Sequence, residues 1–154
     1  MSLIDWENNG WIRPHLTSRE EINQLLEMVK RDIKDSGQKD LSYDWQFGIA
    51  YNAALKLCSI LLYSEGYRPE KVLAHYRTIR ALPHILGNDK QSDADYLDTC
   101  RIKRNTVEYD YIGGVTKENA TELRHYVQEL KEDVIRWLTI NHPEYLEHDD
   151  EPYI

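Results

Sequence analysis

The residues with the clearest chemical potential lie in one stretch, Leu97–Tyr111. Placed on a helix, this stretch forms an apolar stripe at three- and four-residue spacing with Arg104 at its centre. A guanidinium is not deprotonated in proteins, so the stripe must supply carboxylates, carbonyls or water to hold it. Glu108 lies four residues further along the same side, and Arg101 adds a second cation at the border. The remaining members of the stripe are Leu97, Cys100, Val107 and Tyr111.

Two interpretations of this buried arginine compete. In the first, Arg104 is structural: it pairs with a carboxylate and determines how one helix docks on another. In the second, the arginine belongs to a polar pocket that binds an anion such as a phosphate, for which the planar guanidinium fork is well shaped. The residues alone leave both open.

Composition limits the classes of function that the chain can have. Its 154 residues are enough for one domain with a substantial core and too few for two. The 27 acidic and 19 basic residues give a formal net charge of −8. This balance works against tight non-specific binding of nucleic acid, which depends on neutralising phosphates. A local basic pocket on an acidic surface remains compatible with it.

The cysteines and the apolar segments indicate a soluble protein. Cys58 and Cys100 both stand at apolar positions of helical patterns, and we expect two reduced thiols that act as small hydrophobic side chains. No stretch approaches the apolar length of a membrane span, and the N-terminal residues lack a basic-then-apolar signal segment. We therefore expect a cytoplasmic location.

The common catalytic signatures are missing from the sequence. It has no glycine-rich phosphate loop, no Cys-x-x-Cys pair and no nucleophile elbow. No two histidines are four residues apart, so a histidine-based zinc site has no local support, and we expect neither a metal nor a cofactor. We interpret the six histidines as surface or boundary residues; they are His15, His75, His84, His125, His142 and His148.

Amphipathic helical patterns cover most of the chain and predict an all-α fold, an antiparallel bundle of four to five helices. No segment alternates apolar and polar residues over the length of a strand, so we expect no sheet. The chain divides into an extended N-terminal arm (1–16), anchored by its tryptophans, a helical domain (17–142) and a frayed acidic tail (143–154).

Capping residues and helix breakers predict where the first three helices begin and end. A capping box at Thr17 or Ser18 starts the first helix, and Gly37 ends it; the second runs from about Tyr43 to Ser64. The third opens at Pro69 and breaks near Leu82, with an irregular run to about Gln91. Its expected core residues are Val72, Tyr76 and Ile79.

The last two helices are predicted in the same way. Ser92 is the expected N-cap of the fourth, with Asp93 and Asp95 suited to the positive end of its dipole. Gly113–Gly114 ends that helix. The fifth runs from Thr116 to His142–Pro143 and has the most regular apolar stripe of the chain; its members are Leu123, Tyr126, Val127, Leu130, Val134, Trp137 and Leu138.

The segment Arg104-Asn-Thr-Val-Glu-Tyr-Asp-Tyr111 resembles the signature of the HEPN superfamily, small all-helical domains of bacterial toxin–antitoxin and defence systems. In one branch the signature reads Arg-x4-His-x-Tyr and lies on a late helix that follows an alanine-rich one. Arg104, Asn105 and Tyr111 match this pattern, whereas Tyr109 stands at the histidine position. The resemblance covers roughly residues 17–140.

The resemblance implies a homodimer in which the motifs of two subunits meet in one cleft. In active members the cleft is a metal-independent endoribonuclease: by match, Arg104 would hold the phosphate, Asn105 would orient it, and Tyr109 would stand where a histidine moves protons. Tyrosine ordinarily titrates near 10, so Tyr109 can donate a hydrogen bond but is a poor proton carrier. Asp110, the next residue within the looser family spacing, would repel phosphate.

Three functions remain open at this stage. The first is a non-catalytic or attenuated protein that binds RNA, a nucleotide or a protein partner through a cleft formed by Arg101, Arg104, Glu108 and Asp110. The second is a ribonuclease with an altered acid and base. The third is a structural or assembly bundle in which Arg104 only holds the packing.

The resemblance also implies a partner and a modification. Members of the Arg-x4-His-x-Tyr branch are often encoded beside a minimal nucleotidyltransferase antitoxin, which can attach AMP to the tyrosine of the motif. By match, Tyr111 would be the acceptor in this chain.

Overall fold

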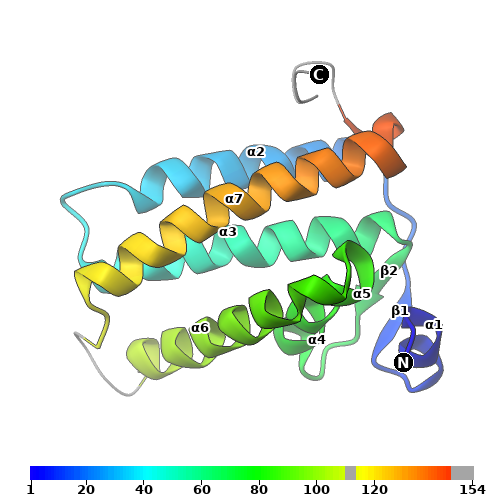
Figure 1. The fold of residues 1–154 in the computed structure, drawn as a ribbon, viewed down its shortest axis with the longest axis horizontal. Coiled ribbons are helices and arrows are strands. Elements are labelled where there is room, and N and C mark those ends of the chain that lie inside the picture. The colour runs from blue at the N-terminus through cyan, green and yellow to red at the C-terminus, as the bar shows by residue number, and fades with distance from the viewer. Residues whose placement is uncertain (110–113, 147–154) are drawn as a thin grey trace.

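The computed structural model describes residues 1–109 and 114–146, with the backbone alone for residues 107–109. The described chain folds into an all-α bundle in which α3 packs against α2 and α7 on one side and against α6, α4 and α5 on the other (Figure 1). In chain order the elements are α1 (Leu3–Asn8), β1 (Ile12–Pro14), α2 (Arg19–Ser36), α3 (Tyr43–Ser64), β2 (Tyr67–Pro69), α4 (Ala74–Arg80), α5 (Leu82–Leu86), η1 (Asn88–Lys90), α6 (Gln91–Tyr109), α7 (Lys117–Asn141) and η2 (Pro143–Tyr145).

Helix α3 is buried around most of its circumference. Phe47, Tyr51, Ala53, Leu57 and Ile60 are all buried. A helix that is apolar on all sides requires neighbours on all sides, and five helices of the bundle meet this requirement. The core of the protein is therefore organised around α3.

The apolar composition of α3 also corrects one expectation. By length and composition this helix could cross a membrane, since an 18-residue window within it has a mean hydropathy of 1.3. The expectation that no segment reaches such apolar length is therefore wrong. In the structure 61% of that window is buried inside the protein, so its character is that of a core helix.

The caps of α2 and α7 confirm the predicted helix ends. Ser18 accepts a hydrogen bond from the backbone N–H of Glu21, and Gly37 is the C-cap of α2. Thr116 and Asn119 form a reciprocal capping box at the start of α7. These hydrogen bonds satisfy backbone N–H groups that have no partner within a helix. Helix α7 ends at the predicted place, with His142 as its C-cap.

The N-terminal residues and the segment after α3 form a small sheet, so the expectation of no sheet is wrong. Strands β1 and β2 are antiparallel, with Ile12 opposite Pro69 and Pro14 opposite Tyr67. Each strand has three residues, which is too short for an alternating pattern to be recognised. The predicted extended arm is also partly helical, because Ser2 and Asp5 form a capping box that starts α1.

The predicted start of the third helix at Pro69 is wrong for the same reason. Pro69 is the last residue of β2, and the N–H of Glu70 donates to the carbonyl of Trp11, which keeps the chain extended. Helix α4 begins only at Ala74, after Leu73 with a φ of 56°. Val72, an expected core residue, is 78% exposed, whereas Ile79 is buried as expected.

The prediction for the region around Pro83 is correct in part. The predicted break falls at Ala81, between α4 and α5, because Pro83 fits the first turn of a new helix but not the interior of an old one. The expected irregular run is instead mostly helical, and it leads through η1 directly into α6 at Gln91. Ser92 is therefore inside α6 and is not its N-cap.

The structure also describes the two cysteines and the first residues of the expected tail. Cys58 and Cys100 are free and buried, as expected, and burial raises the pKa of these thiols to about 12 and about 11, respectively. Leu146 is 4% exposed, and the Asn23 side chain donates to the carbonyl of Tyr145. The packed part of the chain therefore extends to Leu146, beyond the expected start of the frayed tail at residue 143.

Replacing Trp6 tests the anchoring of the N-terminal segment. Trp6 is 5% exposed and forms a small second core with Ile12, Leu62 and Ala81. Trp6→Ala should lower the free energy of unfolding by about 3–5 kcal/mol, measured by chemical denaturation followed by circular dichroism. Trp45, which is 65% exposed, provides the control. Trp45→Ala should change the free energy of unfolding by no more than about 0.5 kcal/mol. Equal effects of the two substitutions would contradict the role of Trp6 as the anchor of the N-terminal segment.

Candidate functional site

Arg104 lies in the last part of α6, beside the core helix. Its side chain is half-buried, and its guanidinium carbon is 5.3 Å from the centre of the Tyr51 ring on α3. A guanidinium at this distance from an aromatic ring is attracted to the negative face of the ring. The structure therefore confirms that the arginine of the predicted stripe is held against the apolar core.

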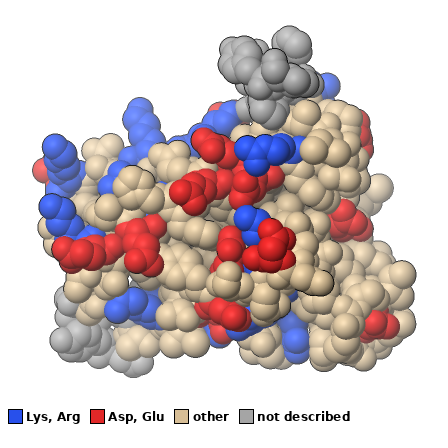
Figure 2. Space-filling model, in the orientation of Figure 1, with Lys and Arg blue, Asp and Glu red and all other residues tan. Residues whose placement is uncertain are grey.

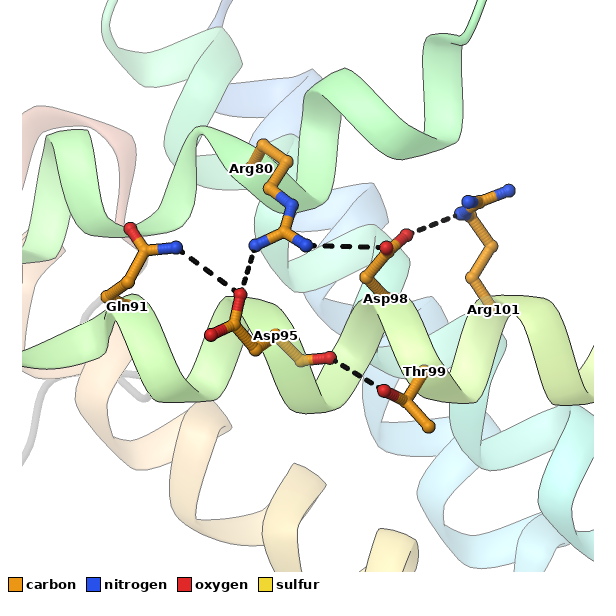
Figure 3. Close-up of polar contacts among 6 residues, drawn as sticks. All are labelled: Arg80, Gln91, Asp95, Asp98, Thr99 and Arg101. Carbon is orange, nitrogen blue, oxygen red and sulfur yellow. Dashed lines mark hydrogen bonds and ion pairs between the residues drawn. The ribbon is translucent and has the colours of Figure 1, made fainter.

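Arg101, one helical turn earlier, belongs to an ion-pair network between α4 and α6 (Figure 3). Its Nε donates to Asp98 at 2.8 Å, and the other oxygen of Asp98 accepts from Arg80 at 3.3 Å. The Arg80 side chain extends from α4 to a position between Asp98 and Asp95 of α6, and it also donates a hydrogen bond to Asp95. The hydrogen bond from Arg80 holds the pKa of the Asp95 carboxyl below its usual value. This network links the two helices at their exposed edge.

Tyr76 of α4 is surrounded by arginines. The guanidinium carbons of Arg77 and Arg80 each lie 5.5 Å from the centre of its ring, and that of Arg101 lies 5.6 Å away. Arg77 also lies over the ring of Trp11 at 3.8 Å. Three cations thus meet at one aromatic ring, on a chain whose formal net charge is −8.

His75 of α4 lies within the electrostatic influence of this cluster. Partial burial of the ring, together with the positive charges of Arg104 and Arg101, lowers its pKa below 6.5. The imidazole is therefore neutral at pH 7, and each of its nitrogens can donate or accept a proton according to tautomer. A neutral imidazole beside two guanidiniums could accept a proton next to a bound anion.

The remaining predicted site residues are only partly placed. Asn105 is on α6 and exposed. Glu108 and Tyr109 belong to the last turn of α6, where the structure describes the backbone alone, and Asp110 and Tyr111 lie outside the described residues. The roles assigned to these four residues stay predictions.

The sequence missed the contribution of α4. Tyr76 was expected in the core, but its ring contacts Arg101. Asp95 was expected to interact favourably with the helix dipole, but it accepts a hydrogen bond from Arg80 of α4. One signal was available: the segment Ala74–Arg80 contains a histidine and two arginines and no acidic residue, although acidic residues outnumber basic ones in the chain. The signal could not be used because nothing local shows that α4 lies on α6.

The wider surface does not have a single sign of charge. Basic and acidic side chains are interspersed over the face drawn in Figure 2. Within residues 1–109 and 114–146, no group of histidine, cysteine and acidic side chains could hold a metal ion. The arginine cluster is defined as Arg77, Arg80 and Arg101 around Tyr76, together with Arg104 over Tyr51. This cluster of α4 and α6 is the candidate site, and its ligand chemistry is that of an anion.

Removing one cation should be detectable at His75. In the variant Arg104→Ala the pKa of His75 should rise, because a neighbouring positive charge no longer opposes protonation. An NMR titration of the histidine ring protons measures this. His84 is the internal control, because burial and the N-terminal charge, not these arginines, lower its pKa. An unchanged His75 titration would mean that the two side chains do not interact.

Comparisons with known proteins leave the chain without an assigned family. No family model matches the sequence, and neither a curated protein nor a solved structure is similar to it at a significant level.

Proposed function

We propose that this protein is a HEPN-like helical protein of a toxin–antitoxin or defence system that binds RNA or a nucleotide through Arg101 and Arg104. The observation that carries the proposal is the position of Arg104, a permanent cation half-buried against Tyr51 at the edge of the core. Arg101 lies one turn away on the same helix, so a second guanidinium lies on the same side of α6.

The local charge supports an anionic ligand. Burial lowers the pKa of His75, and the charges of Arg104 and Arg101 lower it further, so the positive field of the two arginines reaches a residue on α4. A basic site on an acidic surface also favours selective binding, because the rest of the surface repels nucleic acid. The match of Arg104 and Asn105 to the HEPN signature points to RNA as the source of the phosphate.

The proposed assembly is a homodimer that joins the two Arg104 surfaces across a two-fold axis. Two arginine surfaces that face each other require negative charge between them, which a bound phosphate or acidic side chains would supply. A nucleotidyltransferase that modifies Tyr111 is the proposed protein partner.

A second candidate function, a metal-independent endoribonuclease, is favoured by His75. This histidine is neutral at pH 7 and lies within the electrostatic influence of Arg101 and Arg104, although it comes from α4 and not from the motif. It could take the proton-accepting role that Tyr109 cannot fill. A denaturing gel of RNA incubated with the protein and a chelator distinguishes this function from binding alone.

Arg104→Ala should weaken the binding of single-stranded RNA at least about tenfold, because a charge-assisted hydrogen bond to phosphate is lost. Fluorescence anisotropy with labelled RNA measures the affinity. Arg136→Ala is the matched control, since Arg136 is an exposed arginine on α7 whose side chain is 63% exposed.

The outcomes separate the three functions. Loss of binding in a folded Arg104→Ala variant, with intact RNA on the gel, supports the binding function, whereas cleavage that depends on Arg104 supports the nuclease. A purely structural role predicts a third result: the wild-type protein binds no RNA, and the variant unfolds at a lower denaturant concentration because the packing against Tyr51 is lost.

The assembly is tested by light scattering coupled to size exclusion. The proposed dimer should have twice the 18.3-kDa mass of one chain at micromolar concentration. A wild-type mass of one chain would rule out the dimer.

A further inference from the structure

The arginine cluster is larger than one phosphate requires. The proposed function assigns Arg101 and Arg104 to one phosphate. Helix α4 nevertheless contributes two more arginines, Arg77 and Arg80, whose guanidinium carbons lie 5.5 Å from the ring of Tyr76. Because Tyr76 also contacts Arg101, a single aromatic ring joins the cations of both helices.

One of these arginines has a sufficient structural explanation. Arg80 forms ion pairs with both Asp95 and Asp98, and its side chain is only 23% exposed. It connects the C-terminal end of α4 to the middle of α6 and neutralises two carboxylates there. A structural role accounts for Arg80 completely, so the inference does not depend on it.

Arg77 does not have that explanation. Within the described residues its guanidinium donates no hydrogen bond and pairs with no carboxylate; its contacts are the faces of Trp11 and Tyr76. Stacking holds a guanidinium in place but leaves the N–H groups along its edge able to bind an anion. Trp11 itself is fixed by backbone hydrogen bonds, to Trp6 at its N–H and from Glu70 at its carbonyl.

The order of the residues along the two helices indicates a continuous path. Tyr76 lies beside Arg101, whereas Arg80 lies beside Asp95 and Asp98, so α4 runs antiparallel to α6. Arg104, Arg101 and Arg77 therefore follow one another, with Tyr76 between the last two. Cations interleaved with aromatic rings are characteristic of surfaces that bind single-stranded nucleic acid.

We propose that Arg77, stacked between Trp11 and Tyr76, is a second phosphate-binding position, and that Arg104, Arg101 and Arg77 together bind successive phosphates of single-stranded RNA. The proposal rests on the function proposed above and extends it from one phosphate to a chain of phosphodiesters. It also gives the N-terminal segment a role, because β1 and Trp6 hold Trp11 against α4.

The test compares Arg77→Gln with Arg136→Gln by anisotropy, using labelled single-stranded RNAs of about 12 and about 4 nucleotides. Glutamine keeps a flat polar group over Trp11 but removes the charge. Arg77→Gln should weaken binding of the longer RNA about tenfold and make its salt dependence shallower by about 0.7, the value for one phosphate contact on a single strand. Binding of the shorter RNA, which Arg101 and Arg104 can hold, should not change, and Arg136→Gln should resemble the wild type.

Three results would overturn the proposal, and they are distinguishable from one another. If Arg104→Ala abolishes binding while Arg77→Gln leaves the affinity and salt dependence for the longer RNA unchanged, the second phosphate position is wrong and the proposed function stands. If the wild-type protein binds neither RNA, both are wrong. Tighter binding of a DNA strand of the same sequence than of the RNA would exclude RNA as the ligand.

A further variant removes the ambiguity of a folding defect. Circular dichroism establishes whether Arg77→Gln is folded, and Arg77→Lys keeps the charge without the planar fork. If Arg77 binds phosphate, lysine should restore the salt dependence but only part of the affinity. If Arg77 only packs against Trp11, lysine should behave like glutamine.

Discussion

The burial of α3 on nearly all sides is the constraint on which the rest of the structure depends. A helix with core residues around its whole circumference must be covered by several partners, and each partner needs only a narrow apolar stripe to do so. Among the side chains of residues 91–106 of α6, which the structure describes, the buried apolar ones are accordingly few: Ala94, Leu97 and Cys100. The remaining circumference of α6 is free to carry the charged residues that pair with α4, and the candidate site is a consequence of this arrangement.

Electrostatics then separates the structural cations from the available ones. Asp95 and Asp98 both pair with Arg80, and Arg101 shares Asp98. Arg77 is held by aromatic rings instead of by a carboxylate. An arginine that is positioned by stacking keeps its hydrogen-bond donors for another molecule. An arginine in an ion pair has already used some of its donors on the carboxylate. The same cluster can therefore stabilise the α4–α6 contact and bind an anion.

Local signals predicted much of the fold and little of the site. The predicted bounds of the second helix are those of α3, because apolar spacing is a local property. The prediction of a helix start at Pro69 was wrong because a strand partner more than 50 residues away holds that proline in a sheet. Local propensity is overridden when a distant segment satisfies the backbone hydrogen bonds differently.

The sequence by itself determined that the chain is helical, that Arg104 interrupts an apolar stripe, and that Arg101 lies one turn away, because spacing along one helix is a local geometric property. Only the tertiary structure decided that Tyr51 lies under Arg104 and that Trp11, Tyr76 and Arg77 lie together beside Arg101. These residues come from separate elements of the chain. Their juxtaposition follows from how helices and a two-stranded sheet pack around α3, and no spacing within the sequence encodes that packing directly.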